Sequence, residues 1–266
     1  MEVVRSDDAA IAYDVAGSGP AIVLLHPTPA DHEFFFPISK LLAARYRLLM
    51  PDLRGHGESE LGDGPASMQK HAFDVARIMD AAGVERAPLL GVSIGGRVIF
   101  EFWRRFRERV SALILCNTEP RADSSEARAN RYRNADDVLR RGTEPFFESM
   151  VPKLMGETTR HSRPDLVEGA LRMMRRMSPE DVAGVQRGMA QRPDSVSTLK
   201  TINVPTLIIT GDEDVLTGLP DAELMKQNIS GSQLKVVSKA GHFSPWEQPE
   251  EVGSIVRSFL ESSWKA

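Results

Sequence analysis

A serine stands between two glycines where one apolar run of the chain gives way to another. In the segment from Ala87 to Phe100, APLLGVSIGGRVIF, Ser93 lies between Gly91 and Gly95. A tight turn from a strand into a helix strains the backbone of its central residue, and small neighbours let adjacent backbone approach closely. The serine hydroxyl would then stand free at the end of the strand, as in a nucleophile elbow. The apolar strand before the serine and the helix after it favour this interpretation over a chance loop.

A serine hydroxyl is a weak nucleophile at neutral pH, so it needs a base within hydrogen-bonding distance and a carboxylate that orients the base. Of the six histidines, His242 is the only one that follows a late predicted strand, in VVSKAGHFSPW. His71 is expected on a helix surface, and His56, in PDLRGHGES, is expected to have a structural role. His32 and His161 have no motif around them. We therefore predict that His242 is the base.

The segment PTLIITGDEDVLTG places three acidic residues directly after a predicted strand: Asp212, Glu213 and Asp214. The chain order of serine, acid and histidine is the order that follows a nucleophile elbow. Spacing alone does not separate the three acids. Glu119, after the strand that ends at Asn117, is a further alternative.

The oxyanion that forms during acyl transfer needs backbone N–H donors. Ile94, at the start of the helix after the serine, is expected to supply one, and the loop after the AIVLLH strand the other. That loop reads His26-Pro27-Thr28-Pro29, and because prolines have no N–H, Thr28 is the expected donor. A cis Thr28–Pro29 bond would fix the direction of this N–H; we state it as a hypothesis, which a trans bond would remove.

These residues need a scaffold in which strands and helices alternate. Short apolar runs predict the strands AIAYDVA, AIVLLH, YRLLMPD, APLLGV, VSALILCN, PTLIITG and QLKVVSKAG. Continuous apolar runs suit parallel strands that are covered on both faces. Helical patterns cover residues 67–82, 94–106 and 249–260. The alternation predicts a mostly parallel, doubly wound α/β sheet of about eight strands, begun by an antiparallel pair near residues 2–15. Ligands of such sheets bind at the carboxyl ends of the strands.

Residues 119–203 break this alternation, because they carry several helical patterns and no convincing strand. We expect them to form a helical cap inserted between strands 6 and 7, with residues 1–118 and 204–266 as the α/β core. The substrate pocket is expected to draw on the cap and on the segment after the oxyanion loop, at Phe34, Phe35, Met150, Met173 and Met177. Ordinary packing is the favoured explanation for each methionine taken singly, and burial under the oxyanion loop explains the two phenylalanines equally well.

Three arginines of the cap segment LRMMRRM allow two interpretations. Arg172, Arg175 and Arg176 would either attract an anionic substrate or form a solvated face. The solvated face is favoured, because arginines and acids nearly balance across the cap.

Composition limits the classes of partner. The formal net charge of the 266 residues is -4, which gives no broad positive field for a nucleic acid, so a small-molecule ligand is expected. The N-terminal segment lacks a signal-peptide pattern, and no apolar run approaches the ~18 residues of a membrane span. We therefore expect a cytoplasmic protein, monomeric or homodimeric, without a membrane partner. The single cysteine, Cys116, is expected to be buried and structural.

No cofactor or metal is predicted. The histidines and acids show no short ligand spacing, and Cys116 has no second cysteine as a partner. The segment GVSIGG lacks the Gly-x-Gly-x-x-Gly spacing of a dinucleotide site.

Five segments, LLHPTP, PDLRGHGES, GVSIGG, GDEDVLT and AGHFSPWEQPEEV, occur in this order. With them the chain resembles the serine-nucleophile branch of the α/β-hydrolase superfamily over nearly its whole length. It is similar to small carboxylesterases, 3-oxoadipate enol-lactonase-like hydrolases and cofactor-free haloperoxidases. The resemblance implies a catalytic triad of Ser93, Asp214 and His242, and it is what selects Asp214 among the three acids. It also implies that Thr28 and Ile94 form the oxyanion hole.

Single residues separate the chain from neighbouring families of this fold. Haloalkane dehalogenases and epoxide hydrolases have an aspartate in place of Ser93, and hydroxynitrile lyases have a lysine where Phe243 follows the histidine. The usual His-Gly of the oxyanion loop is His26-Pro27 here, a departure that bears on the path of the loop.

The resemblance implies a carboxylic-ester hydrolase that works on small molecules through an acyl-enzyme and needs no cofactor. A lactonase, in which the alcohol stays attached, and a perhydrolase, in which peroxide replaces water, use the same chemistry. Pro29 is compatible with perhydrolysis. A ligand receptor with slow turnover on the same fold is a more distant alternative, and a non-catalytic structural role is weaker still. The sequence does not indicate the acyl or alcohol preference.

Overall fold

The computed structural model describes residues 1–264 of the chain. An eight-stranded sheet with the strand order β1-β2-β4-β3-β5-β6-β7-β8 forms its centre. β2 runs antiparallel to both of its neighbours, and every other neighbouring pair is parallel. This arrangement confirms the predicted sheet and its antiparallel start. The strands are β1 (Glu2–Ser6), β2 (Ala9–Ala16), β3 (Ala21–Leu25), β4 (Arg47–Pro51), β5 (Ala87–Val92), β6 (Val110–Cys116), β7 (Thr206–Gly211) and β8 (Gln233–Val237).

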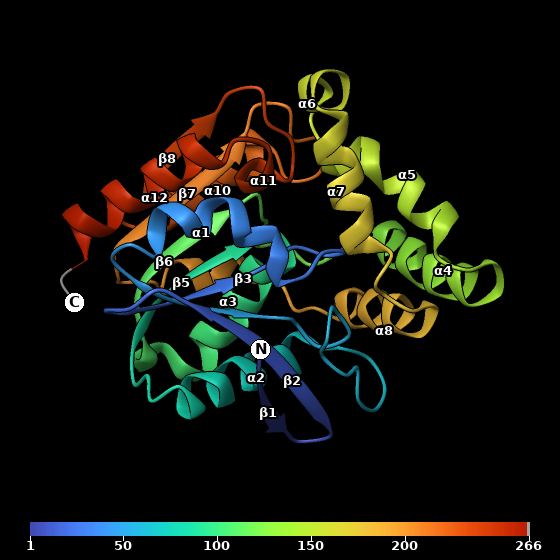
Figure 1. The fold of residues 1–266 in the computed structure, drawn as a ribbon, viewed down its shortest axis with the longest axis horizontal. Coiled ribbons are helices and arrows are strands. Elements are labelled where there is room, and N and C mark those ends of the chain that lie inside the picture. The colour runs from blue at the N-terminus through green and yellow to red at the C-terminus, as the bar shows by residue number, and fades with distance from the viewer. Residues whose placement is uncertain (265–266) are drawn as a thin grey trace.

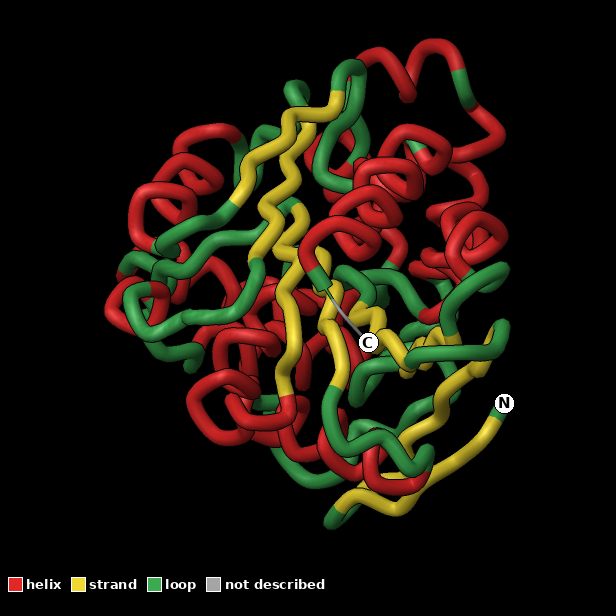
Figure 2. The backbone as a smooth tube through the Cα atoms, turned by 90° about the vertical axis from the view of Figure 1, so that its left-hand side faces the viewer, coloured by secondary structure: helices red, strands yellow, loops and turns green. Residues whose placement is uncertain are grey.

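Helices cover both faces of the sheet (Figure 2), so the central strands are buried on both sides. Every residue of β5 and of β7 is buried, as their continuous apolar runs predict. α1 (Phe36–Leu42) packs against α12 (Pro249–Ser263), whereas α2 (Met68–Ala81) packs against α3 (Ile94–Phe106). The remaining core helices are α10 (Leu219–Asn228), the short α11 (Ser244–Glu247) and the 3₁₀ turns η1 (His32–Phe35) and η2 (Arg107–Arg109). Cys116, at the end of β6, is buried as expected, and burial raises the pKa of its thiol to about 12.

The predicted helix and strand limits hold to within a few residues. Ser67 caps α2 by accepting a hydrogen bond from the Lys70 N–H, as a serine before an apolar helical pattern predicts. β8 is shorter than its predicted run, because the chain turns at Lys239, whose φ is 56°. This turn carries the chain from the sheet to His242.

Six helices lie between β6 and β7, and the described residues of this segment include no strand. They are α4 (Ser125–Arg141), α5 (Glu144–Leu154), α6 (Glu157–Ser162), α7 (Pro164–Met174), α8 (Pro179–Ala190) and α9 (Val196–Leu199). α4 to α8 gather beside one end of the sheet (Figure 1), and α4 packs along α8. α9 instead packs against α3 and α10 of the core. We refer to α4 to α8 as the cap helices.

Nowhere in residues 1–264 does a helix combine the length and the apolar character needed to cross a bilayer.

Candidate active site

Ser93 occupies a strained turn between β5 and α3. Its φ of 54° and ψ of -112° lie outside the regions that residues with side chains ordinarily adopt. A Cβ on Gly91 would collide with the backbone of Gly95, and a Cβ on Gly95 would collide with the carbonyl of Leu25 in β3. Both glycines are therefore required by close backbone approach. The Ser93 hydroxyl has no hydrogen-bond partner within residues 1–264.

His242 and Asp214 form a hydrogen-bonded pair at the ends of two neighbouring strands. Asp214 follows β7 and His242 lies in the loop after β8, and these strands pair in parallel, so their carboxyl ends lie side by side. His242 Nδ1 lies 3.0 Å from Asp214 Oδ2 and 3.2 Å from Oδ1. Both side chains are almost fully buried.

The Asp214 carboxylate is stabilised in its ionised form. Burial alone would raise its pKa, but the charge and hydrogen bonding of His242, together with donors from Asn117 and Thr217, hold the pKa well below its usual value. Because an ionised carboxylate can only accept, His242 Nδ1 carries a proton. The other ring nitrogen, Nε2, has no hydrogen-bond partner among the described residues and is free to accept a proton.

The other acids that follow strands make different contacts. Glu213 accepts a hydrogen bond from the Thr158 N–H at 2.8 Å and so ties the core to α6. Asp212 accepts from the Ala240 N–H at 3.3 Å, and Glu119 pairs with two arginines. Among these acids the structure places only Asp214 against His242.

Ser93 and His242 line the same cavity, which has a volume of about 330 Å³. Thr28 and Thr217 also border it. No hydrogen bond joins the Ser93 hydroxyl to His242 in the described part of the chain. Such contacts often tighten only once substrate is bound, so the shared cavity is the relevant geometry.

Thr28 is held beside the cavity by His56. Thr28 Oγ1 lies 2.9 Å from His56 Nε2, while His56 Nδ1 lies 3.2 Å and 3.1 Å from the carbonyl oxygens of Leu53 and Arg54. Carbonyl oxygens only accept, so Nδ1 carries the proton and Nε2 accepts a hydrogen bond from the Thr28 hydroxyl. Burial lowers the pKa of His56, which keeps this ring neutral. The expected structural role of His56 is therefore the anchoring of Thr28.

The two predicted oxyanion donors are available. Neither the Thr28 N–H nor the Ile94 N–H donates a hydrogen bond to another described residue. The Thr28–Pro29 peptide bond is cis, as hypothesised. Ile94 begins α3, where the first N–H groups of a helix have no acceptor within the helix.

The prediction that His71 lies on a helix surface is wrong. His71 is fully buried, because it shares the inward stripe of α2 with Ala72 and Val75. Its ring nitrogens have no hydrogen-bond partner within residues 1–264, and burial lowers its pKa far below the usual value. His161, on α6, is exposed and lies outside the cavity.

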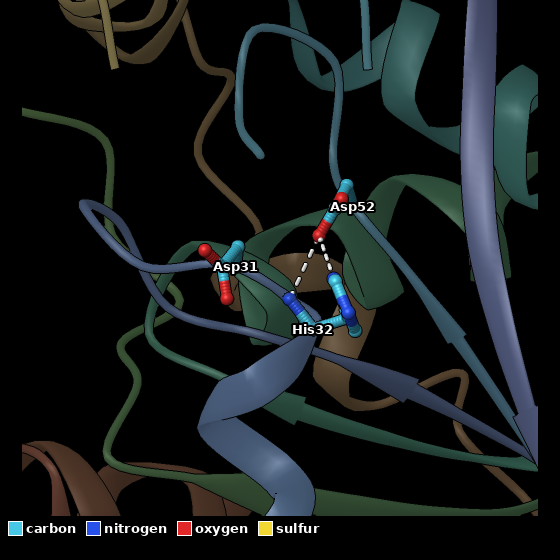
Figure 3. A group of neighbouring side chains, drawn as sticks. All are labelled: Asp31, His32 and Asp52. Carbon is cyan, nitrogen blue, oxygen red and sulfur yellow. Dashed lines mark hydrogen bonds and ion pairs between the residues drawn. The ribbon is translucent and has the colours of Figure 1, made fainter. Parts of the chain in front are cut away.

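His32 lies within a cluster with Asp31 and Asp52 (Figure 3), whose potential ligand atoms are within 4.8 Å of one another. Asp52 Oδ1 accepts hydrogen bonds from both the N–H and Nδ1 of His32, each at 2.8 Å. Asp31 accepts from the Glu33 N–H and pairs with Arg176 at 2.8 Å. The two carboxylates already accept hydrogen bonds or pair with a guanidinium, so these residues do not suit a metal ion. We interpret the cluster as a structural one that holds the loop of Asp31 and His32 against Asp52.

Four of the five predicted pocket residues lie elsewhere. Met150 lines the cavity, but Phe34, Phe35, Met173 and Met177 do not. Phe34 is fully buried against Phe243 and Trp246, because η1 turns its side chain into the core. Met173 and Met177 are almost fully buried and pack in the hydrophobic core.

Sequence reasoning missed the charged groups of the cavity other than Glu119, which it considered only as an alternative acid. Arg97, Arg131 and Lys153 line the cavity, together with Glu119 and Asp123. The position of Arg97, one helical turn after Ser93, is a signal that the sequence offered. Arg131 and Lys153 have no comparable motif, since they come from α4 and α5 of the cap.

The arginines of LRMMRRM do not line the cavity. Arg175 pairs with Glu144 and Glu168 at the surface of the cap. Arg176 pairs with Asp31 and Glu33 of the core. The interpretation as a charged, partly solvated face is therefore the correct one, with Arg176 also joining the cap to the core.

Comparisons with known proteins agree with this fold. Residues 20–249 match the family described as "alpha/beta hydrolase fold". A Bacillus subtilis protein named "Putative 2-succinyl-6-hydroxy-2,4-cyclohexadiene-1-carboxylate synthase" is 30% identical, over 95% of this chain and 96% of its own. The 3-oxoadipate enol-lactonase 1 of Acinetobacter baylyi is 27% identical over 92% and 90% of the two chains. A thermophilic esterase from Thermogutta terrifontis, solved with malate bound, is 35% identical over both complete chains, with a TM-score of 0.96. The chain belongs to the α/β-hydrolase fold family.

Proposed function

We propose that the protein is a serine hydrolase that cleaves carboxylic esters of small molecules through an acyl-enzyme. The observation that carries the proposal is that a hydrogen-bonded Asp214–His242 pair borders the same cavity as the strained Ser93. The likeness to an esterase and to an enol-lactonase supports it.

In the proposed reaction, His242 Nε2 takes the hydroxyl proton of Ser93 while Ser93 Oγ attacks the ester carbonyl. The N–H groups of Thr28 and Ile94 stabilise the oxyanion of the tetrahedral intermediate. The intermediate expels the alcohol, which takes its proton from His242. Water then repeats the sequence on the acyl-enzyme, again with His242 as the base, and releases the acid. Asp214 keeps the imidazole in the required tautomer and stabilises the imidazolium that forms.

The test is hydrolysis of p-nitrophenyl acetate and butyrate by the wild-type chain and by Ser93→Ala. We expect steady turnover by the wild type and none above background for the variant. Ser258→Ala, an exposed serine on α12, is the matched control and should behave as wild type. Undiminished hydrolysis by Ser93→Ala would end the proposal, and a single burst without turnover in the wild type would favour a slow receptor.

The synthase named among the relatives gives a second candidate, in which the same residues form a carboxylate-bearing product instead of hydrolysing an ester or lactone. This candidate predicts that Ser93 reacts with a fluorophosphonate although no ester or lactone is turned over. A panel of short esters, aromatic esters and lactones therefore separates it from the hydrolase, and also separates an esterase from a lactonase.

A further inference from the structure

Among the charged side chains that line the cavity, the positive ones outnumber the negative ones: Arg97, Arg131 and Lys153 against Glu119 and Asp123. Glu119 pairs with Arg97 at 2.8 Å and with Arg192 at 3.0 Å. Asp123 pairs with Arg192 at 2.6 Å and with Arg131 at 2.5 Å. Three guanidinium groups thus share two carboxylates.

Lys153 adds a further positive charge at the cavity wall. It lines the cavity from α5, and no described residue accepts a hydrogen bond from it or forms an ion pair with it. Its ammonium group therefore has its full donor capacity available to a ligand.

The arginine beside the nucleophile lacks full compensation. Arg97 is only 7% exposed, and its Nε–H has no acceptor in the described part of the chain. Burial, and next the repulsion from Arg192, lower the pKa of Arg97 to about 9. A buried cation that is short of partners is costly, and an anion in the adjoining cavity would offset that cost.

Arg131 also has a guanidinium nitrogen, Nη1, that makes no close hydrogen bond within the described residues. Its Nε contacts Asp123, but its Nη1 has only long contacts, at 3.5 Å to Gln186 Oε1 and 3.7 Å to Met189 Sδ. Arg131 and Lys153 come from α4 and α5, two adjacent cap helices (Figure 1). Together they supply two donors that a carboxylate oxygen pair can use.

Two further carboxylates do not cancel this surplus, and of these Asp221 already pairs with Arg121 while Asp214 belongs to the pair with His242. The oxygens of Asp214 accept hydrogen bonds from His242, Asn117 and Thr217, and its side chain is fully buried. The charge of the Asp214 carboxylate is therefore already compensated by its hydrogen-bond donors. An anion on the cap side of the cavity would lie beside Arg131 and Lys153.

We propose that the substrate is a short ester that carries a second, ionised carboxylate, which Arg131 and Lys153 bind on the cap side while Ser93 attacks the ester carbonyl. This inference rests on the proposed esterase function and names its substrate class. The cavity of about 330 Å³ lies near the lower end of small-molecule pockets, which limits the substrate to a short chain.

Two matched pairs of substrates test the charge without changing the shape. Monoethyl glutarate and ethyl glutaramate differ only in carboxylate against amide on the acyl side. 3-Acetoxypropanoate and 3-acetoxypropanamide differ in the same way on the alcohol side. We expect kcat/KM to favour the acid by about tenfold or more in one of the pairs, since a charge-assisted contact contributes more than a neutral one. No preference for the acid in either pair overturns the proposal.

Variants then locate the contact. Lys153→Gln and Arg131→Gln should each lower the ratio of acid to amide kcat/KM by about threefold to tenfold. Arg140→Gln removes the same charge from the exposed surface of α4 and should leave the ratio unchanged. A ratio that neither Lys153→Gln nor Arg131→Gln alters would overturn the assignment.

A binding measurement separates this inference from the proposed function. In Ser93→Ala, millimolar glutarate should raise the melting temperature, whereas glutaramide should not, and Lys153→Gln should remove the difference. If glutarate stabilises but no ester is cleaved, the anion site stands and the esterase proposal fails. If esters are cleaved with no preference for the acid and glutarate does not stabilise, the esterase stands and the anion site fails.

Discussion

The two walls of the cavity are built in different ways. On the core side, Ser93, Asp214 and His242 each follow a strand of one sheet and are placed by backbone geometry and buried hydrogen bonds. On the cap side, Arg131 and Lys153 project from helices on long, flexible side chains, and Arg131 pairs with Asp123 while Lys153 has no partner among the described residues. Under the proposed function the two walls would have different tasks: the core wall would carry out the chemistry, and the cap wall would select the substrate.

Ser93→Ala tests the core wall most severely. The variant should lose on the order of 10⁶-fold in kcat if the three residues act as a unit. The substitution removes one buried hydroxyl without a partner, so the melting temperature should hardly change. Ester hydrolysis and thermal unfolding, measured on the same preparation, check both expectations, and a folded variant with wild-type kcat would show that the chemistry lies elsewhere.

Asp214→Asn should have the next largest effect. An amide at this position is expected to reverse the hydrogen bond to His242 Nδ1 and stabilise the wrong tautomer, which costs about 10⁴-fold in kcat in a comparable triad. Glu213→Gln, on the adjacent carboxylate that contacts α6 instead, is the matched control. The account predicts a ratio of at least 10² between the kcat values of the two variants, and equal effects would contradict it.

Thr28→Val tests the anchor of the oxyanion loop. The variant keeps the N–H and the shape of the side chain but leaves the buried His56 Nε2 without a donor. We expect kcat to fall about tenfold with little change in KM, which is less than the 10²–10³ lost with an oxyanion donor. An unchanged kcat would show that the hydroxyl of Thr28 does not position its N–H.

Arg176→Gln tests the contact that joins the two walls and should have the smallest effect. Burial raises the pKa of Asp31 to about 6 despite the opposing charge of Arg176. A carboxyl whose folded pKa is raised contributes stability below its unfolded pKa of 3.8 and loses that contribution as the pH rises through about 6. Without Arg176 the protein should lose more stability as the pH rises through this range, because the ionised Asp31 would have no cationic partner.

The destabilisation by Arg176→Gln should therefore be near zero at pH 5 and about 1 kcal/mol at pH 8. The expected destabilisation is this small because the Arg176 side chain is 38% exposed to solvent and also pairs with Glu33. Thermal or urea unfolding at both pH values gives the comparison. Arg172→Gln, on the exposed face of α7, should show no such dependence on pH, and the same small effect of Arg176→Gln at both pH values would refute the contact.

The core wall was predictable because its signals are local. Gly91, Ser93 and Gly95 form one turn, and His242 and the acids near Asp214 each follow a recognisable strand. Spacing left three acids open, and the resemblance selected the one that the structure places against His242.

The cap wall was not predictable in the same way. Met150 faces the cavity while Met173 and Met177 face the core, although all three are apolar residues in helical segments. Periodicity shows that a helix has an apolar face but does not show which neighbour covers it. The cationic lining likewise depends on helix packing between residues far apart in the chain, as does the approach of Asp52 to His32 across 20 positions.

The most direct test of the account is the site and rate of reaction with a fluorophosphonate, read by peptide mass spectrometry. The account predicts one adduct per chain, on Ser93, formed by the wild type and slowed by at least 10²-fold in His242→Gln. An adduct on another residue, no adduct at all, or an equal rate without the imidazole would contradict the claim that His242 activates Ser93.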